Sequence, residues 1–280
     1  MSQVARHPSP GSRDTAGARV PPTGVVISIT FLVLTCVGPW LAPYSPLAID
    51  LAHEYATPNA AHWLGTTDNG VDILSMLLHG ARLAGVVAVC VVTTSLLIGA
   101  SLGTLAGYRG GRVDLAIMGA CDLLQAFPSI VLNVAVLALV ARPGLWHLIF
   151  ALVINGWVLF ARIARAQALV LRQAEFVHAA RALGASEPRI LARHVLPNLL
   201  GPLVVQASGA FGSTVLAEST LSFLGLGPGT NASWGALLDQ GSAVLLRFPH
   251  VALFAGVTIA LTIYGFHRTG DHLRDRLDPR

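Results

Sequence analysis

The sequence predicts an all-α membrane protein with six spanning helices, and three observations support this prediction. Only 11% of its 280 residues are charged, whereas about 25% is usual in soluble domains. Hydrophobic residues make up 54% of the chain and its mean hydropathy is +0.65, which is more apolar material than one soluble core of this length can bury. Long stretches of the chain also carry no charge at all.

These charge-free stretches locate the spans, because each is close to the ~20 residues that cross ~30 Å of hydrocarbon as a helix. The stretch 219–238 is interrupted by several glycines, Pro228 and Asn231, which would leave backbone groups unpaired in lipid. We therefore expect a loop there, with a re-entrant or interfacial start. The other stretches predict six helices, at 24–42, 82–107, 115–140, 145–168, 198–223 and 249–268.

The segments outside these helices are polar. Residues 1–23 are rich in Ser, Pro, Gly and Arg and predict a disordered tail. The apolar run that follows is long and carries Gly38-Pro39-Trp40 where a cleavage site would fall, so we expect an uncleaved signal anchor. The expected order is tail 1–23, first span 24–42, outer segment 43–81, a five-helix core 82–268 with an inner loop 165–197 and an outer loop 225–248, and tail 269–280.

The arginines orient the spans. With the N-terminus inside, all but three of the 18 basic residues lie on the inner side, and Arg82, Arg142 and Arg247 lie outside. This satisfies the positive-inside rule and predicts a multi-pass protein of the cell membrane, surrounded by lipid, with both termini in the cytoplasm. Because topology explains the net charge of +4, nucleic acid is not expected as a partner.

The residue types present exclude several chemistries. The chain contains no lysine, so neither a Walker A phosphate loop nor a pyridoxal Schiff base can form. Cys36, Cys90 and Cys121 lie in apolar runs without a CxxC pair and are expected to be small buried hydrophobes. The ten histidines show no metal-ligand spacing. We therefore expect no metal, no cofactor and no catalytic residue.

The inner loop carries the most informative residues. In 175–183, helical spacing places Phe176, Ala180 and Leu183 on one stripe with Val177 and Ala179 beside it, whereas Glu175, His178 and Arg181 share the other face. Such a short amphipathic helix suits docking into a groove of a soluble partner. Periodicity alone equally allows an interfacial helix that rests on the lipid headgroups.

The residues after this helix predict a reversal of the chain. Gly184 ends the helix and suits a C′ position with positive φ. Ser186 can cap a second short helix that tolerates Pro188 in its first turn, and Pro197 restarts the chain into the fifth span.

This loop resembles the EAA loop of ABC-importer permeases, which is the coupling helix that docks on the ATPase subunit. The resemblance lies in Ala179-Ala180, three residues, Gly184 and then Leu196-Pro197. The wider string EFVHAARALGAS, followed by RILARHVLPN, is similar to the dipeptide/oligopeptide/nickel branch of that family. Further matches occur in the same order, at 62–82, 102–114, 122–132, 218–227 with Ser233-Trp234-Gly235, and 273–280.

The resemblance implies a type I ABC-importer transmembrane domain and its partners. These are a homologous permease subunit that completes the pore, two cytoplasmic ATPase subunits and an extracytoplasmic solute-binding protein. The solute would be a dipeptide or a longer peptide, with nickel or another small solute as the alternative. The ATPase-coupling residues would be Glu175, Phe176, His178, Ala179, Ala180, Leu183, Gly184 and Pro197.

The chain departs from the family pattern at three places. His178 stands where the family usually has the Glu of the Glu-Ala-Ala triplet, and Glu175 lies nearby. Met118 is followed by Gly119, where the family commonly has a basic residue. Residues 266–271 are Phe-His-Arg-Thr-Gly-Asp, where the family has Asn-Leu-Leu-Gly-Asp-Gly near its C-terminus.

Four residues within the spans are candidates for the translocation path. Asp122 is a carboxylate below the headgroup level. It either takes part in a proton relay or pairs with hydrogen-bond donors of the bundle in a structural role. Gln125 follows it on the same predicted helix. Pro128 predicts a kink in the third helix, which either lines a path or improves packing. Glu218, near the outer interface, is either a structural anchor or a lining of the outer vestibule.

Two rival functions predict different sequences. An ion-coupled secondary transporter predicts facing charges at the midplane and an inverted repeat, neither of which stands out. A membrane-embedded enzyme of the metalloprotease kind predicts a motif such as HExxH, and the sequence contains none.

Overall fold

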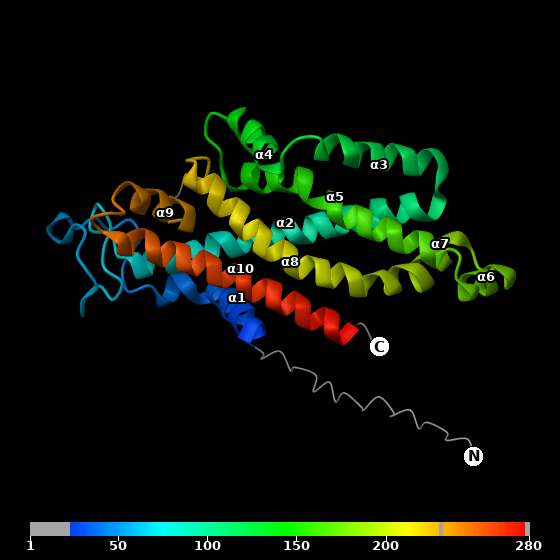
Figure 1. Ribbon diagram of the computed structural model, residues 1–280, viewed down its shortest axis with the longest axis horizontal. Coiled ribbons are helices and arrows are strands. Elements are labelled where there is room, and N and C mark those ends of the chain that lie inside the picture. The colour runs from blue at the N-terminus through cyan, green and yellow to red at the C-terminus, as the bar shows by residue number, and fades with distance from the viewer. Residues whose placement is uncertain (1–22, 230–231, 278–280) are drawn as a thin grey trace, which may run out of the picture.

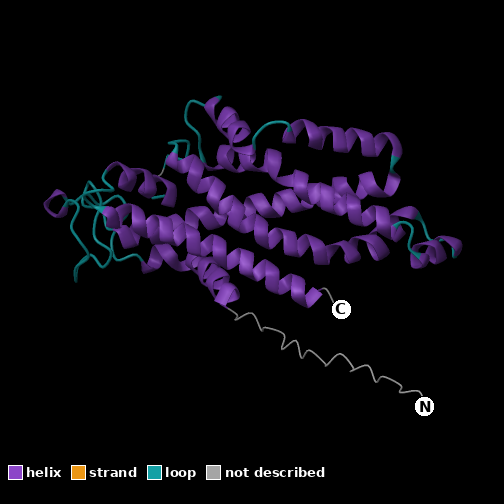
Figure 2. Cartoon of the chain, in the orientation of Figure 1, coloured by secondary structure: helices purple, strands orange, loops and turns teal. Residues whose placement is uncertain are grey.

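The structure is a computed structural model that describes residues 23–229 and 232–277. The described residues are mostly helical and form no strand, only an isolated bridge between Thr66 and Asp72 (Figure 2). Almost all of the expected disordered tail and the last three residues lie outside the described part of the chain. The main helices are α1 (Thr23–Leu41), α2 (Ile73–Arg109), α3 (Gly111–Gln125), α4 (Ser129–Ala138), α5 (Leu145–Leu171), α8 (Leu196–Phe223), α9 (Trp234–Ala243) and α10 (Pro249–Leu277).

The long helices form an elongated bundle in which α1, α2, α5, α8 and α10 run roughly along one axis (Figure 1). All five are long and apolar enough to cross a membrane, α8 as part of the continuous segment Glu187–Phe223. Helices α3 and α4 make a sixth candidate if the bent pair counts as one span. The short helices α6 (Glu175–Ala182) and α7 (Glu187–Ile190) lie at one end of the bundle. We call this the α6 end, and the opposite end, with α9 and residues 43–72, the α9 end.

The third span is broken rather than merely kinked. The axes of α3 and α4 meet at 83°, and Pro128 stands directly before α4, where its carbonyl accepts the first hydrogen bond of that helix from Leu132. Proline has no N–H to continue the ladder of α3 and disfavours a helical conformation in the residue before it. The sequence therefore located the bend correctly, but the continuous helix expected over 115–140 was wrong.

Several helices extend beyond their expected bounds. Helix α2 begins at Ile73, where the Asp72 carboxylate accepts the backbone N–H of Ser75, so the last residues of the expected outer segment are already helical. The charge of Arg82 predicts a helix start at 82, yet one charge does not end a well-capped helix. Helix α10 continues to Leu277 through most of the expected C-terminal tail, and α9 occupies part of the expected outer loop.

Helices α2 and α5 form the most extensive helix pair in the described part of the chain. Gly99, Gly103 and Gly107 of α2 recur every four residues against α5, and a Cβ atom at any of them would collide with the backbone of α5. Small residues at this spacing let two backbones approach closely, which is the usual basis of tight packing in lipid. The pair is thus held by dense van der Waals contact.

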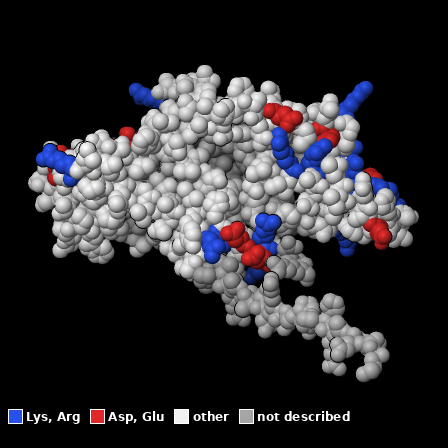
Figure 3. Space-filling model, in the orientation of Figure 1, with Lys and Arg blue, Asp and Glu red and all other residues white. Residues whose placement is uncertain are grey.

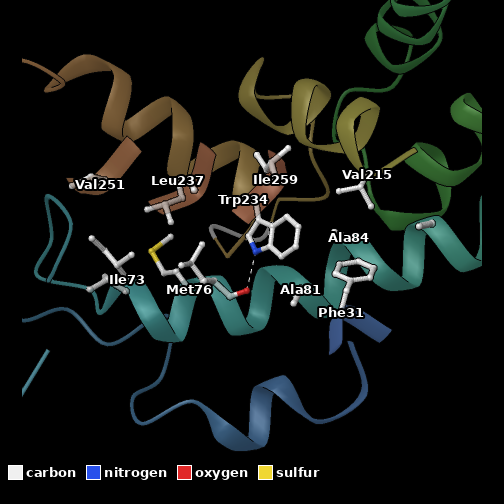
Figure 4. Close-up of a cluster of buried hydrophobic side chains, with 14 of the residues drawn as sticks. Phe31, Ile73, Met76, Ala81, Ala84, Val215, Trp234, Leu237, Val251 and Ile259 are labelled. Atoms are coloured by element: carbon white, nitrogen blue, oxygen red, sulfur yellow. Dashed lines mark hydrogen bonds between the residues drawn. The ribbon is translucent and has the colours of Figure 1, made fainter. Parts of the chain in front are cut away.

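The α9 end contains a hydrophobic cluster built around Trp234 (Figure 4). The Trp234 indole Nε1 donates a hydrogen bond to the Leu77 carbonyl at 2.8 Å, and its ring packs near Phe31 with centroids 5.8 Å apart. Gly80 lies directly beneath the indole, where a side chain would collide with it. The cluster therefore joins α1, α2 and α9 with α8 and α10.

Charges are sparse along the middle of the visible face and gather at the two ends, along the upper right side and around the end of α10 (Figure 3). Many large apolar side chains are exposed, among them Leu115, Leu139 and Trp146. A soluble monomer rarely exposes so much apolar surface. The surface fits a protein that is surrounded by lipid.

Candidate functional site

Helix α6 lies at the turn of the α6 end, as the periodicity of 175–183 predicts. Val177 is fully buried and Ala180 partly buried, and both pack into a cluster with Ile190 and Val195. Phe176 and Leu183 face outward and are 44% and 89% exposed. The single apolar stripe expected from the sequence is therefore divided, because only one side of this short helix reaches the bundle.

Three further residues of the predicted site are also exposed on this helix. Glu175, His178 and Ala179 are all exposed. Together with Phe176 and Leu183 they form what we call the α6 outer face. It combines two large apolar side chains with one carboxylate and one imidazole, a composition suited to contact with another protein.

Gly184 ends α6 in the predicted manner, with φ of +80°. Its N–H donates to the Arg181 carbonyl at 3.0 Å, and the N–H of Ala185 donates to the Ala180 carbonyl at 3.0 Å. These two bonds form a Schellman motif, which requires a residue in the left-handed region. No atom lies within 4 Å of the position that a Gly184 side chain would take, so the demand for glycine comes from the backbone.

The chain then enters α8 through a widened turn. Ser186 stands before α7 as predicted, but its side chain makes no capping hydrogen bond, and Pro188 occupies the first turn. Residues Leu191–Val195 adopt a π-helix, which precedes Pro197 at the start of α8. Because Pro197 has no N–H, the ladder cannot continue in α-helical register there.

A polar cluster ties α6 to the bundle, and sequence reasoning missed it. The Tyr108 hydroxyl, at the end of α2, donates to the Glu187 carboxylate. Arg181 donates to Glu187 at 3.1 Å and to the Tyr108 hydroxyl at 3.1 Å. These two partners hold the pKa of Arg181 above its usual value. The short distance along the chain from Arg181 to Glu187 hinted at a local pair, but no pattern pointed to Tyr108.

Two ion pairs join α3 to α5. Arg165 binds Asp114 with two guanidinium nitrogens, and Arg162 binds Asp122 at 2.7 Å. For Asp122 we considered a proton relay and a structural pairing, and the ion pair with Arg162 fits the structural pairing. Gln125, the last residue of α3, is exposed beside the break before α4.

Glu218 does not lie on an exposed surface. It is 1% exposed, and its two carboxylate oxygens accept hydrogen bonds from the hydroxyls of Ser222 at 2.7 Å and Ser219 at 3.3 Å. A residue that lines a path must be accessible from that path. Of the two roles considered, this burial favours the anchor.

The candidate residues thus form two separate groups. The predicted coupling residues gather at the α6 end, and Asp122, Gln125 and Pro128 follow one another along the broken third span. Within residues 23–229 and 232–277, no three His, Cys, Asp or Glu side chains lie close enough to hold a metal ion.

Comparisons with known proteins indicate the family of the chain. The family model described as binding-protein-dependent transport system inner membrane component matches residues 99–280. Over 265 residues the chain is 40% identical to a probable D,D-dipeptide transport system permease of Escherichia coli strain K12, covering 94% of this chain and 89% of that protein. Over 258 residues it is 37% identical to a dipeptide transport system permease of Alkalihalophilus pseudofirmus, covering 92% and 84%.

A solved structure matches the fold. A chain of the inward-facing MetNI methionine ABC transporter aligns with a TM-score of 0.60 at 19% identity, covering 73% of this chain and 97% of that one. At this identity the likeness concerns the arrangement of helices alone.

Proposed function

The chain belongs to the family of binding-protein-dependent transport system inner membrane components, and we propose that it forms half of a pathway through which an ATP-driven importer moves peptides. The sequence prediction of an ABC-importer transmembrane domain is confirmed by the family match and by the structural neighbour. The chain is accordingly a multi-pass inner membrane permease. Relatives at 36–40% identity are named as dipeptide or oligopeptide permeases, and this supports peptides as the solute.

Family membership implies association with ATPase subunits and with a binding protein. The finer proposal is a heterodimer with a homologous permease, two cytoplasmic ATPases and one extracytoplasmic binding protein. The chain supplies no lysine for a phosphate loop, which supports assigning ATP hydrolysis to the separate subunits. The exposed apolar surface of α3 and α4, with Leu115 and Val131, offers one place for a second permease.

The α6 outer face is the observation that carries this proposal. It presents Phe176 and Leu183 beyond the ends of the long helices. The chain reversal below this face is held in place by Gly184 and by the hydrogen bond from Arg181 to Tyr108. We assign this face to ATPase contact, so that movement of the ATPases would reach α2 through Arg181 and Tyr108. Asp122, Gln125 and Pro128 are proposed to flank the translocation path.

The proposed orientation places α6 and both termini in the cytoplasm and residues 43–72 outside. Single cysteines at Ser186 and Asn59, introduced after removal of Cys36, Cys90 and Cys121, test this with an impermeant thiol reagent. Asn59 should be labelled in intact cells and Ser186 only after the membrane is opened. Labelling of both positions in intact cells would refute the orientation.

The coupling role is tested at Gly184 with two substitutions. Gly184→Val places a β-branched residue in the left-handed region at a cost of about 1–2 kcal/mol, whereas Gly184→Asn is a matched control because asparagine tolerates that conformation. With the partner subunits present, the valine variant should insert normally, lose peptide uptake and retain less ATPase on purification. The asparagine variant should keep uptake. Normal uptake by Gly184→Val would reduce α6 to an interfacial connector.

The solute is tested by uptake in proteoliposomes that contain the full complex. A radiolabelled dipeptide, a longer peptide and Ni²⁺ are offered separately, each with the binding protein of the same transport system. Uptake of a peptide that depends on ATP supports the proposal. Uptake of Ni²⁺ alone would overturn peptide transport while leaving the permease assignment in place.

A further inference from the structure

A small pocket opens at the α9 end, between the turn at 46–49, the loop 67–71 and α9. Its volume is about 130 Å³, and Asp68, Asn69 and Gln240 contribute polar groups to its lining. Pockets that enclose a whole small ligand measure about 300–1,000 Å³. This pocket therefore has room for one side chain rather than for a transported solute.

Asp68 is the only carboxylate that lines this pocket, and it makes no hydrogen bond or ion pair within the described residues. Its Oδ1 atom is buried, as is the Oε1 atom of Gln240, and neither has a hydrogen-bond partner in that part of the chain. Removing a charged oxygen from water without a donor is costly. Asp68 is therefore a half-desolvated acceptor that lacks a positive partner.

The surrounding segment cannot supply that partner. Residues 43–72 contain four acidic residues and no arginine or lysine. Asp50 is bound by His53 at 2.8 Å and Asp72 by His62 at 3.1 Å, which leaves Glu54 and Asp68 without a basic partner. Burial raises the pKa of the Tyr55 phenol above its usual value, and the charges of Asp68 and Glu54 raise it further.

Arg247, at the same end of the bundle, does not neutralise this charge. Its guanidinium lies over the Phe248 ring, 5.3 Å from the centroid, and within the described residues it forms no ion pair. The negative charge of the pocket is thus open to a partner from outside the chain.

The walls of the pocket suit a long basic side chain. Leu47 and Ile49 line it and are 71% and 67% exposed, and Val71 and Met76 form its apolar interior. Lysine and arginine carry an apolar stem below a cationic head that only donates hydrogen bonds. The stem fits against the apolar walls, and the head reaches the Asp68 carboxylate and the amide oxygens.

We infer that this pocket receives a lysine or arginine side chain of the extracytoplasmic binding protein when that protein docks. The inference rests on the proposed function, since it takes the α9 end to face outward. A bound divalent ion fits less well, because Ca²⁺ takes 6–8 oxygen ligands and the pocket supplies a single carboxylate among apolar walls. The exposed Leu47 and Ile49 then contact the binding protein around this central charge pair.

The test measures how tightly the binding protein of the same transport system binds the purified complex in nanodiscs. Asp68→Asn removes the charge from the pocket with little change in shape, and Glu54→Gln is the matched control, because it removes the same charge from an exposed residue outside the pocket. Asp68→Asn should raise the Kd about tenfold or more, since it removes one partner of a desolvated charge pair. Glu54→Gln should change the Kd less than about threefold, as expected for an exposed rim charge.

A second arm identifies the partner residue. Asp68→Lys should abolish docking, and one Lys→Glu or Arg→Glu substitution on the binding protein should restore it. Equal Kd values for Asp68→Asn, Glu54→Gln and the unmodified complex would overturn the inference. Loss of docking on addition of EDTA, reversed by Ca²⁺, would overturn it in favour of a metal site.

These outcomes are separable from a failure of the proposed function. If the unmodified complex binds no extracytoplasmic protein and shows no ATP-dependent uptake, the function itself fails. If uptake and docking persist in Asp68→Asn at full affinity, only the pocket assignment fails.

Discussion

Helix α5 is held on two sides by two different kinds of contact. Against α2 it packs backbone to backbone over Gly99, Gly103 and Gly107. Against α3 the contact is less extensive, with two ion pairs, Arg165 with Asp114 and Arg162 with Asp122. Dense apolar contact in lipid resists displacement, whereas polar pairs can be exchanged for other polar partners. The comparison identifies α2 and α5 as a rigid pair and α3 as a segment whose position depends on a few polar contacts.

The largest effect is expected from breaking the rigid pair with Gly103→Leu. The added side chain meets the backbone of α5 at Ala161, so the helices must separate, at a cost of about 3 kcal/mol or more. Membrane abundance and the thermal unfolding temperature in detergent should both fall strongly.

Gly119→Leu is the control for that prediction. Gly119 lies on α3, and no atom occurs within 4 Å of its Cβ position. This variant should retain normal abundance in the same assay. Similar losses for the two variants would mean that the glycine spacing of α2 has no special role.

An intermediate effect is expected from Asp114→Asn. The Asp114 and Arg165 side chains are 20% and 34% exposed, so loss of the pair should destabilise the protein by about 1–2 kcal/mol, less than for a fully buried pair. Thermal unfolding measures the change, and Asp122→Asn should cost less because that pair is more exposed. A double-mutant cycle with Arg165→Gln should show coupling, and strictly additive effects would contradict a direct contribution of the ion pair.

The smallest effect on stability is expected from Tyr108→Phe, because Arg181 and Glu187 are exposed. Loss of the hydroxyl removes two hydrogen bonds between α2 and the α6 end, so it should loosen the connection without unfolding the chain. The unfolding temperature should stay unchanged, while stimulation of ATPase activity by the binding protein should decrease. Tyr264→Phe on α10 is the control, since its hydroxyl makes no hydrogen bond within the described residues. Full stimulation in Tyr108→Phe would show that this cluster does not transmit movement.

The two ends of the bundle differ in how well the sequence predicts their structure. At the α6 end, Gly184 and the short helix before it were predicted correctly, because a helix stop is a local backbone property. At the α9 end, the expected loop contains α9, whose Trp234 is held by a hydrogen bond to Leu77 far away in the sequence. Glycines near Trp234 indicated a loop, whereas packing against α10, α8 and α2 stabilises a helix there.

The sequence by itself determined the class of the protein, the approximate position of its spans and the reversal after α6. These features follow from hydropathy and from backbone preferences, which act over one or two turns of chain. Only the tertiary structure decided that the third span breaks by 83° at Pro128, that Asp122 pairs with Arg162, and that Glu218 is enclosed by serine hydroxyls rather than exposed to a path. The physical reason is that a charge or proline shows where a helix is unusual, whereas its partner depends on which distant surfaces pack together.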